Sequence, residues 1–198
     1  MIRRMELRDL SECVEIHMAS FPGFFLSSLG RSFLTILYRG YVTDRDGIAL
    51  VYVDPGTNKA VATAVGVARP SQFYWRQLLW HGHQYALAAL PAVLRSPRIV
   101  TRLLRAIAKP AVVSKERDSA EWSSMAVVPA FRRCGIAGQL TEAMKDEARK
   151  RGAAYLYGWT DEVGNDPINR HHKKAGAHYI KQFRTPEGRV MNIIRYSL

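Results

Sequence analysis

The stretch of the sequence with the most distinctive chemistry spans residues 125–140. A strand-like run ends at Pro129, which cannot donate to a sheet, and the basic turn that follows opens directly into a helix pattern. The first amides of a helix have no acceptor within the helix, and the helix dipole adds positive charge there. Small residues leave those amides accessible, and arginines add donors: Gly135, Ala137, Gly138, Arg132 and Arg133. This arrangement predicts a binding site for phosphate groups.

A second segment of interest lies further along the chain, and it contains Asn165, His172, Lys174 and Gly176. The first segment, Arg132-x-x-Gly135-x-Ala137 after a Val-Val-Pro strand end, resembles the acyl-CoA signature of the GNAT superfamily of N-acetyltransferases, [QR]-x-x-G-x-[GA]. The second resembles the family's Asn…Tyr-x-Lys-x-Gly segment. The resemblance extends well over residues 119–198, weakly over residues 1–69, and not over the residues between them.

The resemblance implies acetyl-CoA as the cosubstrate, without a metal or a further organic cofactor. The CoA pyrophosphate would bind to the turn and the helix start, which comprise Arg132, Arg133, Cys134, Gly135, Ile136, Ala137 and Gly138. Cys134 is expected to act through its backbone. The pantetheine arm would pair with the strand end, Ala126, Val127 and Val128, with the Val127 amide also donating to the thioester oxygen. Asn165 would contact the pantetheine or the thiol end, or serve only as a turn residue.

The resemblance also suggests Glu121 and His172 as catalytic residues. Some family members place a general-base glutamate at the position of Glu121, which on a regular strand shares a face with Val127, six residues later. His172 replaces the usual tyrosine that protonates the departing thiolate, and an imidazole can do this as imidazolium or as the neutral donor. The structural alternatives are a solvated or ion-paired Glu121 and a surface His172.

The elements that must position these residues alternate along the chain. Strands are predicted over residues 2–6, 48–53, 60–68, 121–128, 153–159, 178–183 and 189–196. Helices are predicted from a cap at Asp9 or Ser11 to about residue 21, and over residues 28–41, 135–151 and 165–175. We therefore expect one α/β (α+β) domain over residues 1–198, with a GNAT-like mixed, mostly antiparallel sheet flanked by helices.

Residues 70–118 are predicted to form a basic helical insertion between the third and fourth strands, with eight basic and two acidic residues. An apolar stripe of Ile99, Val100, Leu103, Leu104 and Ile107 lies opposite Arg98, Arg102, Arg105 and Lys109. The basic face is interpreted as solvated, with an acidic acceptor, a partner subunit such as a second copy, or an anionic membrane surface as alternatives. The aromatic residues are expected to pack within the fold, or to form a wall around an acceptor: Phe73, Tyr74, Trp75 and Trp80.

Length and composition limit the class of protein. A chain of 198 residues with 47% hydrophobic residues can bury about 70% of its surface in one core. Two cysteines, no signal-peptide pattern and no apolar run long enough for a bilayer predict a soluble, cytoplasmic protein without stable membrane insertion. A net charge of +12 favours an anionic ligand. Zinc-site, zincin and Walker patterns are absent from the sequence.

These observations favour an N-acetyltransferase that moves an acetyl group from acetyl-CoA to a primary amine by direct attack in a ternary complex. The acceptor is expected to be a small molecule, with the basic and aromatic insertion favouring an amino sugar or a nucleotide-linked amine. Two alternatives are a non-catalytic acyl-CoA-binding module and, less favoured, a basic nucleic-acid-binding protein. Release of thiol with a panel of amines would distinguish an enzyme from a non-catalytic acyl-CoA-binding module. Steeply salt-dependent binding to duplex nucleic acid would instead indicate a nucleic-acid-binding protein.

Overall fold

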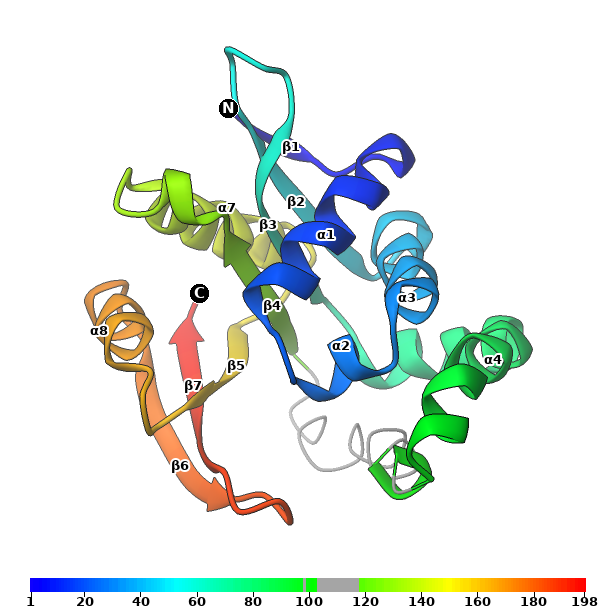
Figure 1. The fold of residues 1–198 in the computed structure, drawn as a ribbon. Coiled ribbons are helices and arrows are strands. Elements are labelled where there is room, and N and C mark those ends of the chain that lie inside the picture. The colour runs from blue at the N-terminus through cyan, green and yellow to red at the C-terminus, as the bar shows by residue number, and fades with distance from the viewer. Residues whose placement is uncertain (98, 103–117) are drawn as a thin grey trace.

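The computed structural model describes residues 1–97, 99–102 and 118–198. Seven strands form one mixed sheet in the order β1-β2-β3-β4-β5-β7-β6 (Figure 1). Neighbouring strands are antiparallel except for β4 and β5, which are parallel. The strands are β1 (Ile2–Arg4), β2 (Gly47–Val53), β3 (Ala60–Val67), β4 (Ser119–Val127), β5 (Tyr155–Asp161), β6 (His178–Arg184) and β7 (Val190–Ser197). The predicted strands and the mixed sheet are confirmed.

The helices lie in two layers on either side of the sheet (Figure 1). On one face α1 and α3 pack against β2 and β3, and on the other face α7 packs against β2, β3 and β4. The helices are α1 (Leu10–Ser20), α2 (Phe25–Ser28), α3 (Arg31–Thr43), α4 (Pro70–Arg95), α7 (Ile136–Lys150) and α8 (Asp166–Lys174), with short 3-10 turns η1 (Leu7–Asp9) and η2 (Pro129–Phe131). The predicted helices are present, with boundaries shifted by a few residues.

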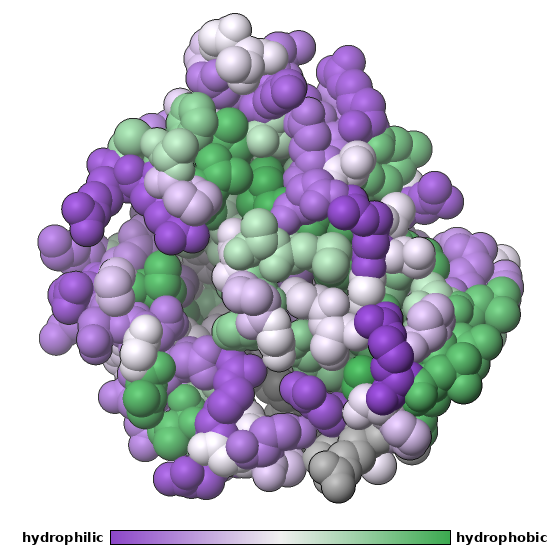
Figure 2. All heavy atoms as spheres, in the orientation of Figure 1, coloured by the Kyte–Doolittle hydropathy of each residue, from purple (hydrophilic) through white to green (hydrophobic). Residues whose placement is uncertain are grey.

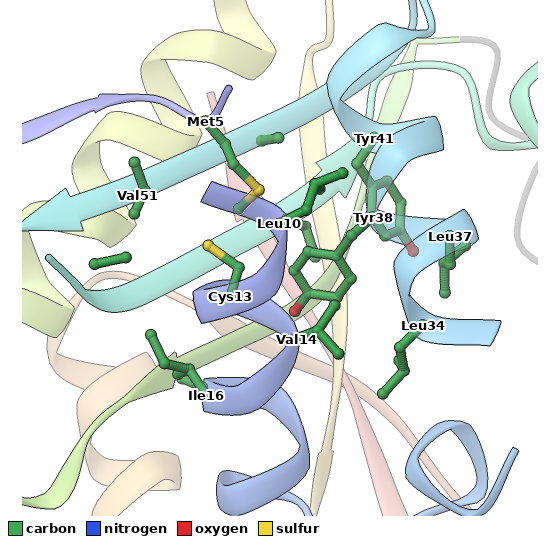
Figure 3. Close-up of a cluster of buried hydrophobic side chains, with 14 of the residues drawn as sticks. Met5, Leu10, Cys13, Val14, Ile16, Leu34, Leu37, Tyr38, Tyr41 and Val51 are labelled. Atoms are coloured by element: carbon green, nitrogen blue, oxygen red, sulfur yellow. The ribbon is translucent and has the colours of Figure 1, made fainter. Parts of the chain in front are cut away.

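The core on the first face forms because α1 and α3 both turn apolar residues toward the sheet. Cys13, Val14 and Leu34 are fully buried between these helices and Val51 of β2. Tyr38 of α3 joins them, and its ring lies edge-on to Tyr41 (Figure 3). A second core on the opposite face unites α7 with the sheet through Leu140, Met144, Leu156, Ile194 and Tyr196.

A β-bulge interrupts the pairing of β3 with β4. Val65 pairs with Ser124 and Gly66 with Trp122, so Ser123 has no opposite residue. Gly66 permits this close approach because a Cβ at that position would collide with the carbonyl oxygen of Glu121. The extra residue reverses the alternation of side chains along β4.

The insertion begins with α4, which lies between β3 and β4 in the sequence as predicted. Its inner side packs against the first core through Phe73, whose ring stacks on Tyr41 with 5.3 Å between centroids. The prediction that Trp75 and Trp80 pack inside is wrong, because their side chains are 64% and 68% exposed. The predicted apolar and basic stripes after residue 98 lie mostly outside the described residues.

Candidate active site

The two central strands separate at the middle of the sheet. β4 pairs with β5 only from Ser119 to Glu121, opposite Tyr155 to Tyr157. Beyond Glu121, β4 has no strand on its β5 side within the described part of the chain. This divergence leaves an open strand edge beside α7 and α8.

The backbone groups at this open edge follow from the alternation of the antiparallel ladder. Val128 donates to the carbonyl oxygen of Val61 in β3, at 3.0 Å. Hydrogen-bonded pairs alternate along such a ladder, so Ala126 also directs its backbone polar groups to β3. Met125 and Val127 direct theirs to the open edge, and Arg132 Nε donates to the Val127 oxygen at 3.2 Å. Met125, which the sequence analysis missed, is thus available at the edge, whereas Ala126 and Val128 are committed to β3.

The turn after β4 delivers the start of α7 to the same place. Arg133 and Gly135 both have left-handed backbones, with φ of 65° and 75°, and Gly135 is the N-cap of α7. Gln139 donates to the Gly135 oxygen at 3.1 Å, so the amides between these two residues have no acceptor in the helix. A Cβ at Gly135 or Gly138 would meet no atom within 4 Å. Open space therefore adjoins the donors of the helix N-terminus.

The side chains of this turn add positive charge at its surface. Arg132, Arg133 and Cys134 are all exposed. Ile136, the first residue of α7, is buried and anchors the turn on the second core. The open amides at the start of α7 and the positive charge of Arg132 and Arg133 suit a phosphate-bearing ligand, which the sequence also predicts.

Glu121 lies in a cluster of hydroxyl groups on the α1–α3 face of the sheet. Tyr74 of α4 donates to Glu121 Oε1 at 2.7 Å, and Ser123 donates to the same oxygen at 3.2 Å. Burial and the Glu121 charge raise the pKa of the Tyr74 hydroxyl well above its usual value, so it stays protonated and remains a donor. Burial also raises the pKa of the neighbouring Tyr41.

This placement corrects the expected strand geometry. The bulge at Ser123 puts Glu121 on the face covered by α1 and α3, whereas Met125 and Val127 pack toward α7. Glu121 and Val127 therefore do not share a face. The signal in the sequence is Gly66 in β3, which has no side chain and permits the close approach of Glu121.

His172 is buried, with 8% of its surface exposed. Its Nδ1 lies 2.7 Å from the Tyr196 hydroxyl, and its ring stands edge-on to Trp122 with 5.7 Å between centroids. Burial, with a smaller effect from neighbouring His171, lowers the pKa of His172 to about 4. The ring is neutral at physiological pH, and the surface alternative for His172 is wrong.

Asn165 holds the junction between β5 and α8. It is the N-cap residue of α8, and its Nδ2 donates to Thr160 Oγ1 at 2.6 Å. Thr160 in turn donates to Asn169 Oδ1 at 2.8 Å, and Asn169 donates to the Asp161 oxygen at 2.9 Å. These bonds fix α8 beside the open edge of β4, a positioning role for Thr160 and Asn169 that the sequence analysis missed.

Two open hollows lie away from this site. One of about 500 Å³ adjoins α8, β6 and β7, and one of about 550 Å³ adjoins Phe24, Asp161 and Arg189. Neither contains Glu121 or the start of α7, so we place the site at the diverging strands, where open donors and acceptors are concentrated. Among the described residues, no cluster of three or more His, Cys, Asp or Glu could hold a metal, and no helix has the length and apolarity to cross a bilayer.

Comparisons with known proteins agree with this geometry. Residues 10–177 match the family model described as the Acetyltransferase (GNAT) family. No curated protein matches the sequence. Among solved structures, Ard1 from Thermoplasma volcanium is 15% identical with a TM-score of 0.64, covering 100% of this chain and 97% of that chain.

Two further structures have the same fold. An aminoglycoside 6'-N-acetyltransferase complexed with coenzyme A is 10% identical with a TM-score of 0.64, covering 100% of this chain and 96% of that one. The ribosomal-protein-S18-alanine N-acetyltransferase from Escherichia coli is 16% identical with a TM-score of 0.57, covering 100% and 92%. With the family model spanning most of its length, the chain belongs to the GNAT family of acetyltransferases.

Proposed function

We propose that this acetyltransferase moves the acetyl group of acetyl-CoA to a primary amine of a small molecule, by direct attack in a ternary complex. The observation that carries the proposal is the meeting of an open strand edge with an open helix N-terminus, at Val127 and Gly138. Such a pair of features suits an extended ligand that has amide groups at one end and a pyrophosphate in its middle.

The residues proposed for CoA divide into two groups. Arg132, Arg133 and the amides from Cys134 to Gly138 would hold the pyrophosphate, because they lie at the start of α7, where Gly135 and Gly138 adjoin open space. The backbone of Val127 would pair with the pantetheine arm at the open edge. The carbonyl oxygen of Val127 accepts from Arg132 and retains a second lone pair for a pantetheine amide. Asn165 would keep α8 beside the arm.

The reacting carbonyl fits better at Met125 than at Val127. Glu121 lies six residues from Val127, about 20 Å along a regular strand, which is too far for one reaction centre. Met125 is the next residue with its amide at the open edge, and the bulge at Ser123 shortens its separation from Glu121. We therefore assign the thioester oxygen to the Met125 amide, a donor of the kind that is typically worth about 3–4 kcal/mol in acyl transfer.

Glu121 is the proposed general base. The carboxylate is partly exposed, and its partners Tyr74 and Ser123 both donate to one oxygen, Oε1. Donors of this kind favour the charged form of a carboxylate and fix its orientation. The base would remove a proton from the acceptor ammonium, which has no lone pair for attack until that proton leaves.

His172 is the proposed donor of the proton to the departing thiolate. Because burial lowers its pKa to about 4, the imidazolium form is scarce at neutral pH and only the neutral ring can donate. A Tyr196 hydroxyl that donates to Nδ1 leaves the proton of the neutral ring on Nε2. Tyr196 is then a positioning residue for this step: it orients Nε2–H toward the thiolate, and the ring takes a proton back from solvent after the transfer.

The ion pairs of Arg76, a basic residue of α4, bear on the class of acceptor. Arg76 is held by Asp44 and Asp46, with two contacts of 2.5 Å, so its charge is neutralised in place. Trp75 and Trp80 face outward, away from Tyr74. A phosphate group on the acceptor gains no support from these residues, and the proposal is a small amine such as an amino sugar.

Binding of acetyl-CoA is tested by thermal unfolding. At about 100 times its dissociation constant a ligand of the folded state adds about 2.7 kcal/mol, or roughly 5–10 °C for a chain of this size. Gly138→Glu should abolish the shift, because its side chain enters the open space and its charge repels phosphate. Gly138 is preferred to Gly135, whose left-handed backbone would strain any other residue.

The matched control is Gln139→Glu, which adds the same charge at the next, exposed position of α7. It should retain most of the shift. An unchanged melting temperature of the wild-type protein in millimolar acetyl-CoA would refute the CoA site. Turnover is tested by release of thiol with amino sugars, amino acids and polyamines, and binding without release on any amine would refute the catalytic part of the proposal.

A further inference from the structure

The outward face of α4 is apolar and exposed. Between residues 75 and 94, ten residues are exposed and nine of them are apolar, with His83 as the exception. At 3.6 residues per turn the most exposed members fall on one side of the helix. We call this set the α4 outer face: Trp75 (64% exposed), Leu79 (65%), Trp80 (68%), Leu87 (69%) and Leu94 (75%). Figure 2 shows hydrophobic side chains gathered along the edge of the molecule where Figure 1 places α4.

The opposite side of α4 is fixed to the rest of the fold. Phe73 is fully buried on the first core, and Ala89 and Ala92 pack against Leu29, which follows α2, and Phe33 of α3. The Arg76 guanidinium, held by Asp44 and Asp46, adds an ion pair at the N-terminal end. The helix therefore presents its outer face from a firmly anchored position.

The stretch of sequence that contains this helix carries charge of one sign. From residue 55 to residue 115 the sequence holds nine Lys and Arg and no Asp or Glu. Acidic partners come from outside this stretch: Asp44 and Asp46 for Arg76, Asp46 for Arg69, and Glu187 for Arg102. In the sequence this stretch therefore carries a formal charge of +9, which favours an anionic surface as the partner.

We propose that the α4 outer face binds the surface of an anionic lipid bilayer, with the helix lying in the plane of the interface. Tryptophan and leucine side chains bury into the boundary between headgroups and acyl chains, while Lys and Arg attract anionic headgroups. A second copy of the chain fits this face less well. Self-association would bring two stretches of nine cations together without added carboxylates.

The experiment is flotation of the full chain with vesicles of phosphatidylcholine alone or of three parts phosphatidylcholine to one part phosphatidylglycerol. The protein should float with the anionic vesicles and not with the neutral ones. Raising the salt from about 0.1 M to about 1 M shortens the screening length from about 10 Å to about 3 Å, so binding should weaken at least about tenfold. Emission from Trp75 and Trp80 should shift to shorter wavelength with anionic vesicles, and Trp75→Phe with Trp80→Phe should remove that shift.

Leu79→Glu with Leu87→Glu should weaken binding to the anionic vesicles at least about tenfold, because it removes apolar area and adds negative charge. The matched control is Leu7→Glu with Val163→Glu, which adds the same two charges at apolar side chains that are 54% and 77% exposed outside α4, and it should bind like the wild type. Circular dichroism checks that each variant is folded.

Absence of flotation with anionic vesicles, or equal flotation of the double variant and the wild type, would overturn the proposal. So would a stable dimer without lipid that the double variant converts to monomers in sedimentation, because the face would then belong to a second copy.

Discussion

Tyr74→Phe removes one hydroxyl from the candidate active site and little else. The hydroxyl donates to Glu121 Oε1 at 2.7 Å, and a hydrogen bond to a charged group is typically worth about 1.5–3 kcal/mol. One pH unit corresponds to about 1.4 kcal/mol, so losing this bond makes the carboxylate easier to protonate by about one to two pH units. The acid limb of kcat/KM for acetyl transfer should move to higher pH by that amount. Well above the limb the rate should change little, because the carboxylate is ionised in both proteins.

The assay is release of thiol from acetyl-CoA between about pH 5 and pH 9, with the acceptor found in the amine screen. Tyr85→Phe is the matched control, since Tyr85 also lies on α4 and donates to a neutral amide oxygen, Gln77 Oε1, at 3.1 Å. Its acid limb should coincide with that of the wild type. Glu121→Gln should lose the limb altogether and with it most of the activity near neutral pH.

A Tyr74→Phe profile that overlays the wild-type profile would show that the hydrogen-bonded carboxylate does not control the rate. The same conclusion follows if both tyrosine variants shift the limb equally, because a general loosening of α4 would then be the cause. In either case Glu121 would be a structural partner of the insertion, and proton removal would have to be assigned elsewhere.

Other outcomes follow from the same structure. Acetyl-CoA should slow alkylation of the exposed Cys134, measured by mass spectrometry. Cys13, whose thiol pKa is raised to about 12 by burial, should stay unmodified throughout. Equal labelling of Cys134 with and without acetyl-CoA would contradict the proposed CoA site. Burial lowers the pKa of His17 and of His172 to about 4, against 6.5 in the unfolded chain. Between these two pH values the unfolded chain binds more protons than the folded one. The free energy of unfolding should therefore fall as the pH drops from about 6.5 to 4, by roughly 3 kcal/mol for each histidine. Denaturant unfolding at several pH values measures this, and a flat profile down to pH 4.5 would contradict it. His172→Ala should lower kcat about 10²–10⁴-fold with little change in KM for acetyl-CoA, and His172→Tyr should recover part of the loss; a normal kcat in His172→Ala would remove its acid role.

Periodicity and turn chemistry were enough to predict the order of elements. Pro167 near the start of α8 and Pro129 after β4 mark boundaries that the structure reproduces within about a residue. The turn that opens into α7 was also predictable, because Gly135 takes a left-handed backbone that favours glycine.

The parts that sequence reasoning missed depend on contacts between distant segments. The bulge at Ser123 arises from pairing with β3, and nothing in β4 itself marks it. Tyr74 reaches Glu121 across 47 positions of sequence, and an apolar helix such as α4 does not reveal which of its aromatic residues face outward. The burial of His172 likewise depends on Trp122 and Tyr196, which come from two other strands.

The open edge of β4 also matters for how the protein is handled. Unpaired strand groups are a template for another chain, and most proteins protect them with charge, short length or a covering element. Within the described residues no strand pairs with the open-edge groups of Met125 and Val127, although Arg132 donates to the Val127 oxygen, and the gap beside them closes at Glu121, where β5 rejoins the sheet. Only a few residues of a foreign strand could enter before meeting the closed end. This edge can therefore seed self-association of the ligand-free protein without sustaining an extended cross-strand assembly, and a ligand that occupies it should reduce aggregation during refolding and storage.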